Sequence, residues 1–216
     1  RHWPAEFTCA LLNAQPMGFY SPATIIEDAK RHNIEIRPVS VTQSFWDCTL
    51  EPLDEVECSG EQESKGAKPL FAVRMGLRFV KGLGRGHWER ILEARSKAPF
   101  SSLEDFVQRC GLDREALSSL AQAGALEALR QGRRDALWGV LGALRKPKGP
   151  LPTRERETQP SFVPLTAWET VIWDYRTQEH SPLAHPLAMV REGLRKMGFP
   201  TAREISGMGQ GSKVRY

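Results

Sequence analysis

The residues best suited to chemistry lie in the segment Lys81-Gly82-Leu83-Gly84-Arg85-Gly86, between an apolar run and an amphipathic helical pattern. The two glycines around Leu83 allow a tight turn with little side-chain bulk, so the backbone N–H groups that open the next helix can approach a phosphate. Leu83 is expected to pack inward, while Lys81 and Arg85 add positive charge at the rim. This order of residues is typical of a helix-hairpin-helix that binds a nucleic-acid backbone without reading its sequence.

We therefore predict a DNA-binding site composed of Arg78, Lys81, Gly82, Leu83, Gly84, Arg85 and Gly86. A Gly-x-Gly turn is also common where no phosphate binds, but residues 70–97 carry seven Lys or Arg against two Glu, which favours DNA contact. We expect Gly84→Val to crowd the turn. A dinucleotide-binding fingerprint is excluded because His87 stands where its third glycine is needed.

No catalytic or metal-binding residues stand out. The sequence has no P-loop, no nucleophile elbow and no H-E-x-x-H pair. The four cysteines form no C-x-x-C pair, so we expect reduced thiols rather than zinc ligands. His180 and His185 are expected to be surface or helix-capping residues. Trp46 is the tryptophan considered for stacking, and the others are mostly at core-like helical positions.

The elements that would position the turn are mainly helices. Ser21 before Pro22 predicts a helix start, and Asn33 can end that helix. Residues 34–41 look extended, with Pro38 at an edge. Residues 71–79 alternate as in a half-buried strand, whose second half could instead lead into a short helix.

Further helices follow the turn. Ser101 with Glu104 and Thr166 with Glu169 have capping-box spacing, and Asp113 can cap a helix that stops near Gly124. A last helix is expected from about 186 to 197. A second hairpin-like unit spans 103–129, with Ala123-Gly124-Ala125-Leu126 at its turn; its single glycine and few charges favour packing support over DNA contact.

Composition bounds these expectations. The 216 residues are 40% hydrophobic and 26% charged, as in a folded soluble protein, and no apolar run approaches the roughly 20 residues that span a bilayer. The chain lacks an initiator Met and a secretory signal, so we expect an excised cytoplasmic fragment. Residues 47–63 carry seven acids and no Lys or Arg, which predicts a solvated acidic loop, and residues 146–152 are expected to be a linker.

The residues also resemble a known family, the error-prone, alpha-subunit-like bacterial DNA polymerases of the C family (ImuC type). The resemblance rests on Pro4-Ala5-Glu6-Phe7, Ala10 to Asn13, Gln15 to Tyr20, Asp28-Ala29, Arg37-Pro38-Val39, Trp46-Asp47-Cys48 and Arg74 to Gly84. It covers essentially the whole chain and is weakest between residues 144 and 164.

This resemblance implies a mainly α fold with a few short strands. It implies a distal fingers segment at 1–69, a tandem helix-hairpin-helix at 70–130, a helix and linker at 131–164, and a helical connector at 165–216. The connector would lead toward an OB-fold, of which residues 214–216 would be the entry.

The resemblance further implies template-directed nucleotidyl transfer in damage-induced mutagenesis and translesion synthesis. The metal-binding carboxylates belong to a palm domain outside this chain, so Mg²⁺ is expected there, no cofactor is expected here, and the chain alone should be inactive. The expected partners are primer-template duplex and an accessory protein resembling an inactive Y-family polymerase. Without a Gln-x-x-apolar-aromatic peptide in residues 146–173, a sliding clamp would bind only indirectly. The alternative is a protein-interaction module that docks such an accessory protein.

Overall fold

The computed structural model describes residues 3–53, 71–145, 160, 162–209, 211 and 213. The elements in chain order are α1 (Pro4–Asn13), α2 (Pro22–Arg31), β1 (Ile36–Arg37), β2 (Thr49–Pro52), β3 (Phe71–Arg74), the 3-10 helix η1 (Leu77–Phe79), α3 (Arg85–Lys97), α4 (Leu103–Cys110), α5 (Arg114–Gln122), α6 (Arg133–Arg145), α7 (Ala167–Gln178), α8 (Pro186–Lys196) and α9 (Ala202–Ser206). This confirms a mainly α fold with a few short strands. The chain forms two compact units, Arg1–Pro182 and Leu183–Tyr216. The four segments expected from the sequence, with boundaries after residues 69, 130 and 164, stay a prediction.

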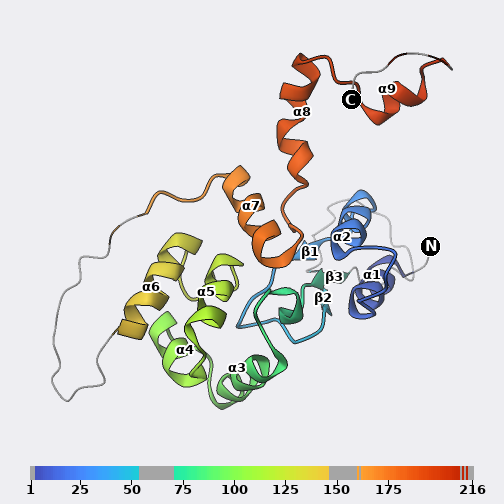
Figure 1. The fold of residues 1–216 in the computed structure, drawn as a ribbon. Helices are drawn as coiled ribbons and strands as arrows, with labels where there is room; N and C mark the ends of the chain where they lie inside the picture. The colour runs from blue at the N-terminus through green and yellow to red at the C-terminus, as the bar shows by residue number, and fades with distance from the viewer. Residues whose placement is uncertain are drawn as a thin grey trace, which may run out of the picture. The chain divides into compact units, whose positions relative to one another are not determined.

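A small sheet joins α1 and α2 to the rest of the first unit (Figure 1). Its strand order is β1-β3-β2, with β3 parallel to β1 and antiparallel to β2. Only Ile36–Arg37 of the extended segment predicted at 34–41 forms a strand. The alternating residues 71–79 divide as the sequence allowed, into a strand and then η1.

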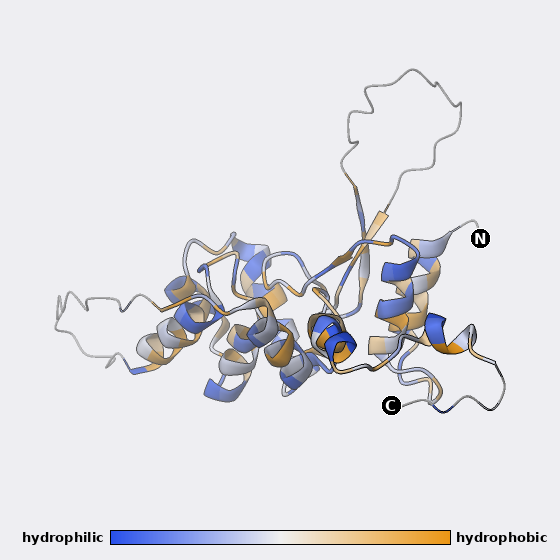
Figure 2. Ribbon diagram, turned by 90° about the horizontal axis from the view of Figure 1, so that it is seen from above, coloured by the Kyte–Doolittle hydropathy of each residue, from blue (hydrophilic) through white to orange (hydrophobic). Residues whose placement is uncertain are grey.

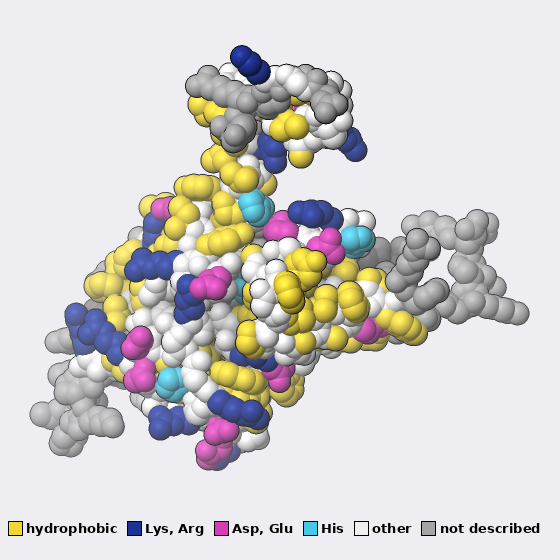
Figure 3. All heavy atoms as spheres, turned by 45° about the vertical axis from the view of Figure 1, so that its right-hand side comes forward, with side chains coloured by type: hydrophobic (Ala, Val, Ile, Leu, Met, Phe, Trp, Pro, Cys, Tyr) yellow, Lys and Arg dark blue, Asp and Glu magenta, His cyan; other side chains and the backbone are white. Residues whose placement is uncertain are grey.

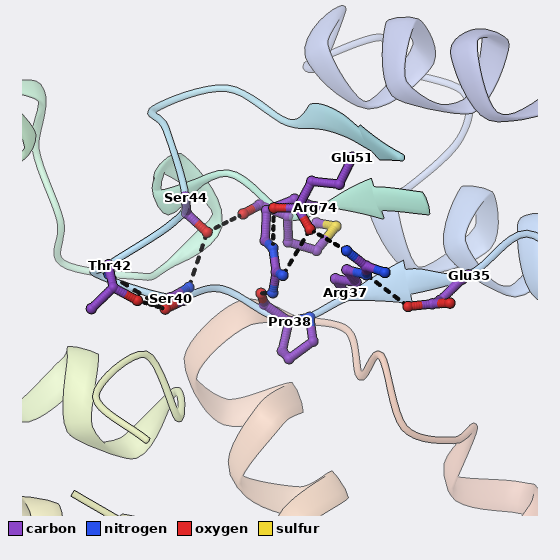
Figure 4. A network of polar contacts seen from close by, with 9 residues as sticks. Glu35, Arg37, Pro38, Ser40, Thr42, Ser44, Glu51 and Arg74 are labelled. Atoms are coloured by element: carbon purple, nitrogen blue, oxygen red, sulfur yellow. Dashed lines mark hydrogen bonds and ion pairs between the residues drawn. The ribbon is translucent and has the colours of Figure 1, made fainter. Parts of the chain in front are cut away.

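The sheet is held by a network of charged groups, drawn in Figure 4. Glu51 of β2 accepts hydrogen bonds from Arg74 of β3 at 2.9 and 2.8 Å and from Arg37 of β1 at 2.8 Å. Arg74 and Arg37 together hold the pKa of Glu51 below its usual range. The prediction of a solvated acidic loop is therefore wrong for Thr49–Pro52, because two arginines of adjacent strands recruit Glu51 into the sheet; residues 54–63 of that loop lie outside the described part.

Helices α3 to α6 pack side by side in the first unit, and α5 also contacts α7 (Figure 1). Each of these helices carries hydrophobic and hydrophilic residues on different sides of its ribbon (Figure 2). The apolar sides meet in a core that contains the fully buried Ile91, Leu103, Phe106 and Leu117. Burying such side chains stabilises the layer by roughly 1.5–3 kcal/mol each.

Most predicted helix ends are confirmed. Ser21 accepts a hydrogen bond from Thr24 N–H, Asp113 from Ala116 N–H, and Thr166 and Glu169 form a capping box. The cap predicted at Ser101 is wrong by one residue. Ser102 accepts from Asp105 N–H, while Ser101 N–H donates to the Asp105 carboxylate, and this register turns Leu103 into the core.

The tryptophans are less buried than their helical spacing predicted. Trp88 is buried, whereas Trp3, Trp138 and Trp168 are about half exposed. Trp46, considered for stacking, packs partly buried against the core.

The second unit holds α8 and α9, neither of which buries a residue. His185 caps α8 by accepting a hydrogen bond from Leu187 N–H, as predicted, and Gly198 follows the helix with a positive φ of 81°. The linker expected at 146–152 and the strand entry expected at 214–216 lie outside the described residues. Within the described ranges, no helix is both long and apolar enough to cross a bilayer.

Candidate nucleic-acid interface

The predicted hairpin forms between η1 and α3. Gly82 has a φ of +80°, which favours glycine, and Gly84 occupies the N-cap of α3 in an extended conformation. Leu83 is 9% exposed and belongs to the core, so its predicted role as a packing residue is confirmed. The backbone thus bends around a buried apolar side chain and leaves both glycines at the surface.

Several backbone donors of the hairpin are available. Among the described residues, the N–H groups of Gly82, Arg85 and Gly86 have no hydrogen-bond acceptor. The N–H of Gly84 donates to His87 Nδ1 at 3.1 Å. The first turn of a helix also carries positive partial charge, so these N–H groups are suited to an anion.

The space beside Gly84 and Gly86 is open, whereas a Cβ added at Gly82 would lie 3.4 Å from Ser119 Oγ and 3.9 Å from Glu115 Oε1. A Cβ added at Gly84 or at Gly86 would meet no atom within 4 Å. The expectation that Gly84→Val crowds the turn is therefore wrong, because the extended backbone directs position 84 outward. A side chain at this position would instead extend into open space at the surface.

The cations at the rim each have an acidic neighbour. Lys81 Nζ lies 2.9 Å from Glu179 Oε1, and Arg85 Nε lies 3.9 Å from Glu89 Oε1. All four side chains are more than half exposed, so the pairs are weak and can open. Figure 3 shows basic and acidic side chains likewise interspersed on the face that it displays.

Arg78, the remaining predicted site residue, is positioned differently. Its guanidinium donates to the carbonyl oxygens of Asn13 at 3.3 Å and Gln15 at 2.8 Å, and to Asp47 Oδ1 at 2.8 Å. These bonds tie the loop after α1 to η1. Arg78 therefore braces the base of the hairpin, and the structure does not bring its guanidinium to the rim with Lys81 and Arg85.

A second hairpin joins α4 to α5, whereas the sequence predicted the turn of the second unit at residues 123–126. Gly111, with a φ of +55°, the buried Leu112 and the N-cap Asp113 join α4 to α5 and repeat the order Gly82, Leu83, N-cap. Here the Asp113 carboxylate accepts a hydrogen bond from Ala116 N–H, which holds its pKa below the usual range. A negative charge at this N-terminus disfavours phosphate. The signal that could have found this hairpin is Gly-apolar-Asp between two helical patterns.

The turn predicted at 123–126 follows α5 and is buried. Ala123, Ala125 and Leu126 are fully buried, and Ala125 O accepts a hydrogen bond from Val41 N–H. A Cβ added at Gly124 would lie 2.8 Å from Nε of Arg133. This burial is consistent with the packing role favoured for the turn.

His180 corrects a further prediction, since it is fully buried rather than on the surface. Its Nδ1 lies 2.8 Å from Gln178 O, so Nδ1 carries the proton, and Nε2 has no partner among the described residues. The ring meets Phe79 of η1 edge-on at 5.9 Å. Burial lowers the pKa of His180 to about 4, so the imidazole is neutral at pH 7.

Acid should destabilise the protein through His180. Between pH 6.5 and 4 the unfolded chain binds a proton that the folded chain excludes, so the free energy of unfolding should fall by about 2 to 3 kcal/mol as the pH falls through this window. Urea titrations across this range would measure the loss. His180→Gln should lack this part of the loss and His185→Gln should keep it; equal pH profiles for wild type and His180→Gln would refute the assignment.

The described residues do not fit a metal site. Among them, no group of three or more His, Cys, Asp or Glu could hold an ion. Cys9, Cys48 and Cys110 are buried free thiols, and burial raises the pKa of Cys48 and Cys110 to about 12. Their thiolates are therefore poorly available as ligands.

Comparison with known proteins identifies what this chain is similar to. A family model described as "Helix-hairpin-helix motif" matches residues 33–136. The chain is 41% identical to the "Error-prone DNA polymerase" of Alkalilimnicola ehrlichii over 99% of the chain and 20% of that protein, and 39% identical to that of Methylococcus capsulatus over 99% and 21%. It is 42% identical to that of Pseudomonas syringae pv. tomato over 94% and 19%. The chain thus spans about a fifth of these curated relatives, and the predicted resemblance is confirmed.

Proposed function

We propose that this chain, homologous over nearly its whole length to a segment of proteins named error-prone DNA polymerase, is the part of such a polymerase that holds DNA. The observation that carries the proposal is the surface hairpin of Gly82, Gly84 and Gly86: the N–H groups of Gly82, Arg85 and Gly86 have no acceptor among the described residues, and a Cβ added at Gly84 or Gly86 would meet no atom within 4 Å. Its ligand would be a phosphate of duplex DNA, bound without base contacts.

The activity of the whole protein extends this proposal. The intact protein would be a DNA-directed DNA polymerase acting in the cytoplasm on primer-template DNA, in damage-induced mutagenesis and translesion synthesis. The chain itself would be inactive, since the metal-binding carboxylates and their Mg²⁺ would belong to another part of the protein. An accessory protein resembling an inactive Y-family polymerase would link it to the sliding clamp.

Charge reversal at the hairpin should weaken duplex binding. Lys81→Glu places a carboxylate beside the phosphate position, and we expect about a tenfold loss of affinity at 0.1 M salt and a shallower salt dependence. Fluorescence anisotropy with a labelled duplex would measure both. Lys97→Glu, at the other end of α3, is the matched control and should change affinity much less.

Gly84→Val tests the backbone donors separately from the charge. The valine side chain would occupy the open space in front of the hairpin, so affinity should fall by about tenfold while the fold is retained. Circular dichroism would verify folding. Wild-type affinity in both Lys81→Glu and Gly84→Val would sink the assignment of DNA contact to this hairpin.

A second candidate is a module that docks an accessory protein. Trp3 and Phe7, one turn apart at the start of α1, and Phe19 and Tyr20 in the loop after it are all at least half exposed. Such apolar exposure is typical of protein contacts. Capture of the accessory protein at high salt, lost in a Phe7→Ser/Phe19→Ser variant and combined with no affinity for DNA, would favour this function.

A further inference from the structure

The end of α7 lies against the first hairpin, although the two are far apart in the sequence. Lys81 N–H donates to Thr177 O at 2.8 Å, and Lys81 Nζ pairs with Glu179 Oε1 at 2.9 Å. The ring of His180 meets that of Phe79 edge-on at 5.9 Å. Three independent contacts therefore connect one short segment, Thr177–His180, to the residues that lead into the glycine turn.

The conformation of Glu179 is unfavourable by local rules. It is the C-cap of α7 with a φ of +63°, a left-handed conformation that residues with a side chain rarely adopt. A carboxylate there also lies at the negative end of the helix dipole. Local preference therefore does not explain an acid at this position, whereas the contact with the Lys81 ammonium does.

We propose that Thr177–His180 belongs to the same DNA-binding site as the first hairpin, and that Glu179 is an exchangeable counter-anion that a DNA phosphate displaces from Lys81. Thr177 O accepts a hydrogen bond from the Lys81 backbone and His180 packs against Phe79, so both are positioning residues. This inference rests on the proposed function.

A phosphate can replace Glu179 as the partner of Lys81 at little energetic cost. Lys81 and Glu179 are 51% and 69% exposed, and such surface pairs contribute little to stability. A phosphate would gain the Lys81 ammonium together with the open N–H groups of Gly82, Arg85 and Gly86. Each binding event would leave Glu179 without its partner, so Glu179 should reduce both the affinity for DNA and its dependence on salt.

Removing the counter-anion should therefore strengthen binding. We expect Glu179→Gln to bind a labelled duplex about threefold to tenfold more tightly at 0.1 M salt, with a log–log salt slope steeper by about one. The gain should vanish when Lys81→Gln is added. Glu93→Gln is the control, because it removes the same charge from an exposed pair with Lys97 at the far end of α3 and should leave affinity unchanged.

The outcomes distinguish the inference from the function on which it rests. Salt-dependent binding that Lys81→Gln weakens and Glu179→Gln leaves unchanged would overturn the counter-anion while the proposed function stands. No binding by the wild-type chain would overturn both. For the positioning role, His180→Ala should weaken binding and His180→Phe, which keeps the edge-on ring, should restore it; equal affinity in His180→Ala and wild type would overturn that role.

Discussion

Replacing Asp174 with Ala should lower the free energy of unfolding by about 3 to 5 kcal/mol, as expected when one partner of a buried ion pair is removed. The Asp174 side chain is fully buried, and its two oxygens accept hydrogen bonds from Arg133 Nη1 and Ser181 Oγ, both at 2.6 Å. Without the carboxylate, the buried guanidinium of Arg133 keeps the carbonyl oxygen of Gln122 as a hydrogen-bond acceptor, and among the described residues its remaining charged partner is the half-exposed Glu127. Urea denaturation monitored by tryptophan fluorescence would measure the change.

Two comparisons identify the cause of that loss. Asp174→Leu combined with Arg133→Met should regain much of the stability, because no uncompensated charge remains in the interior. Glu93→Ala, which breaks an exposed pair with Lys97, should have little effect. A loss for Asp174→Ala no larger than that for Glu93→Ala would contradict the structure at this site.

The first hairpin was predictable because its signals are local. Gly82 takes a left-handed conformation, Leu83 packs inward and Gly84 caps the helix, and each follows from the residue types over a few positions. The caps at Asp113 and Thr166 were predictable for the same reason. The site residues themselves stay a prediction that DNA binding must test.

Contacts between distant segments were not predictable in the same way. Arg78 lies among other basic residues in the sequence, yet its guanidinium donates hydrogen bonds to the carbonyl oxygens of Asn13 and Gln15. His180 lies two residues before Pro182 in a segment typical of a surface loop, yet it is fully buried and packs edge-on against Phe79. The spacing of residues determines local geometry, whereas these partners meet only after the helices pack.

The role of Gly76 was not predictable from the sequence either, because it depends on a distant segment. Gly76 joins β3 to η1, and its φ of −78° is open to any residue, so its sequence context gives no reason for a glycine. An added Cβ would lie 2.4 Å from Trp46 O, 2.5 Å from Asp47 C and 2.8 Å from Cys48 N. These are backbone atoms of the segment entering β2, which cannot move aside as a flexible side chain can.

Gly76→Ala should therefore cost about 3 to 4 kcal/mol, at or above the upper end of ordinary overpacking. The cost arises because the segment before β2 must separate from η1, whose Leu77 N–H donates to Phe45 O and Arg78 N–H to Trp46 O. Gly142→Ala, in α6 with open space at its Cβ, is the matched control and should instead stabilise the protein by up to about 1 kcal/mol. Chemical denaturation of both variants would compare them directly, and equal stabilities would show that residues 46–48 do not pack on Gly76.

Since η1 leads directly into the glycine turn, a folded Gly76→Ala variant should also bind duplex DNA more weakly, whereas Gly142→Ala should bind as the wild type does.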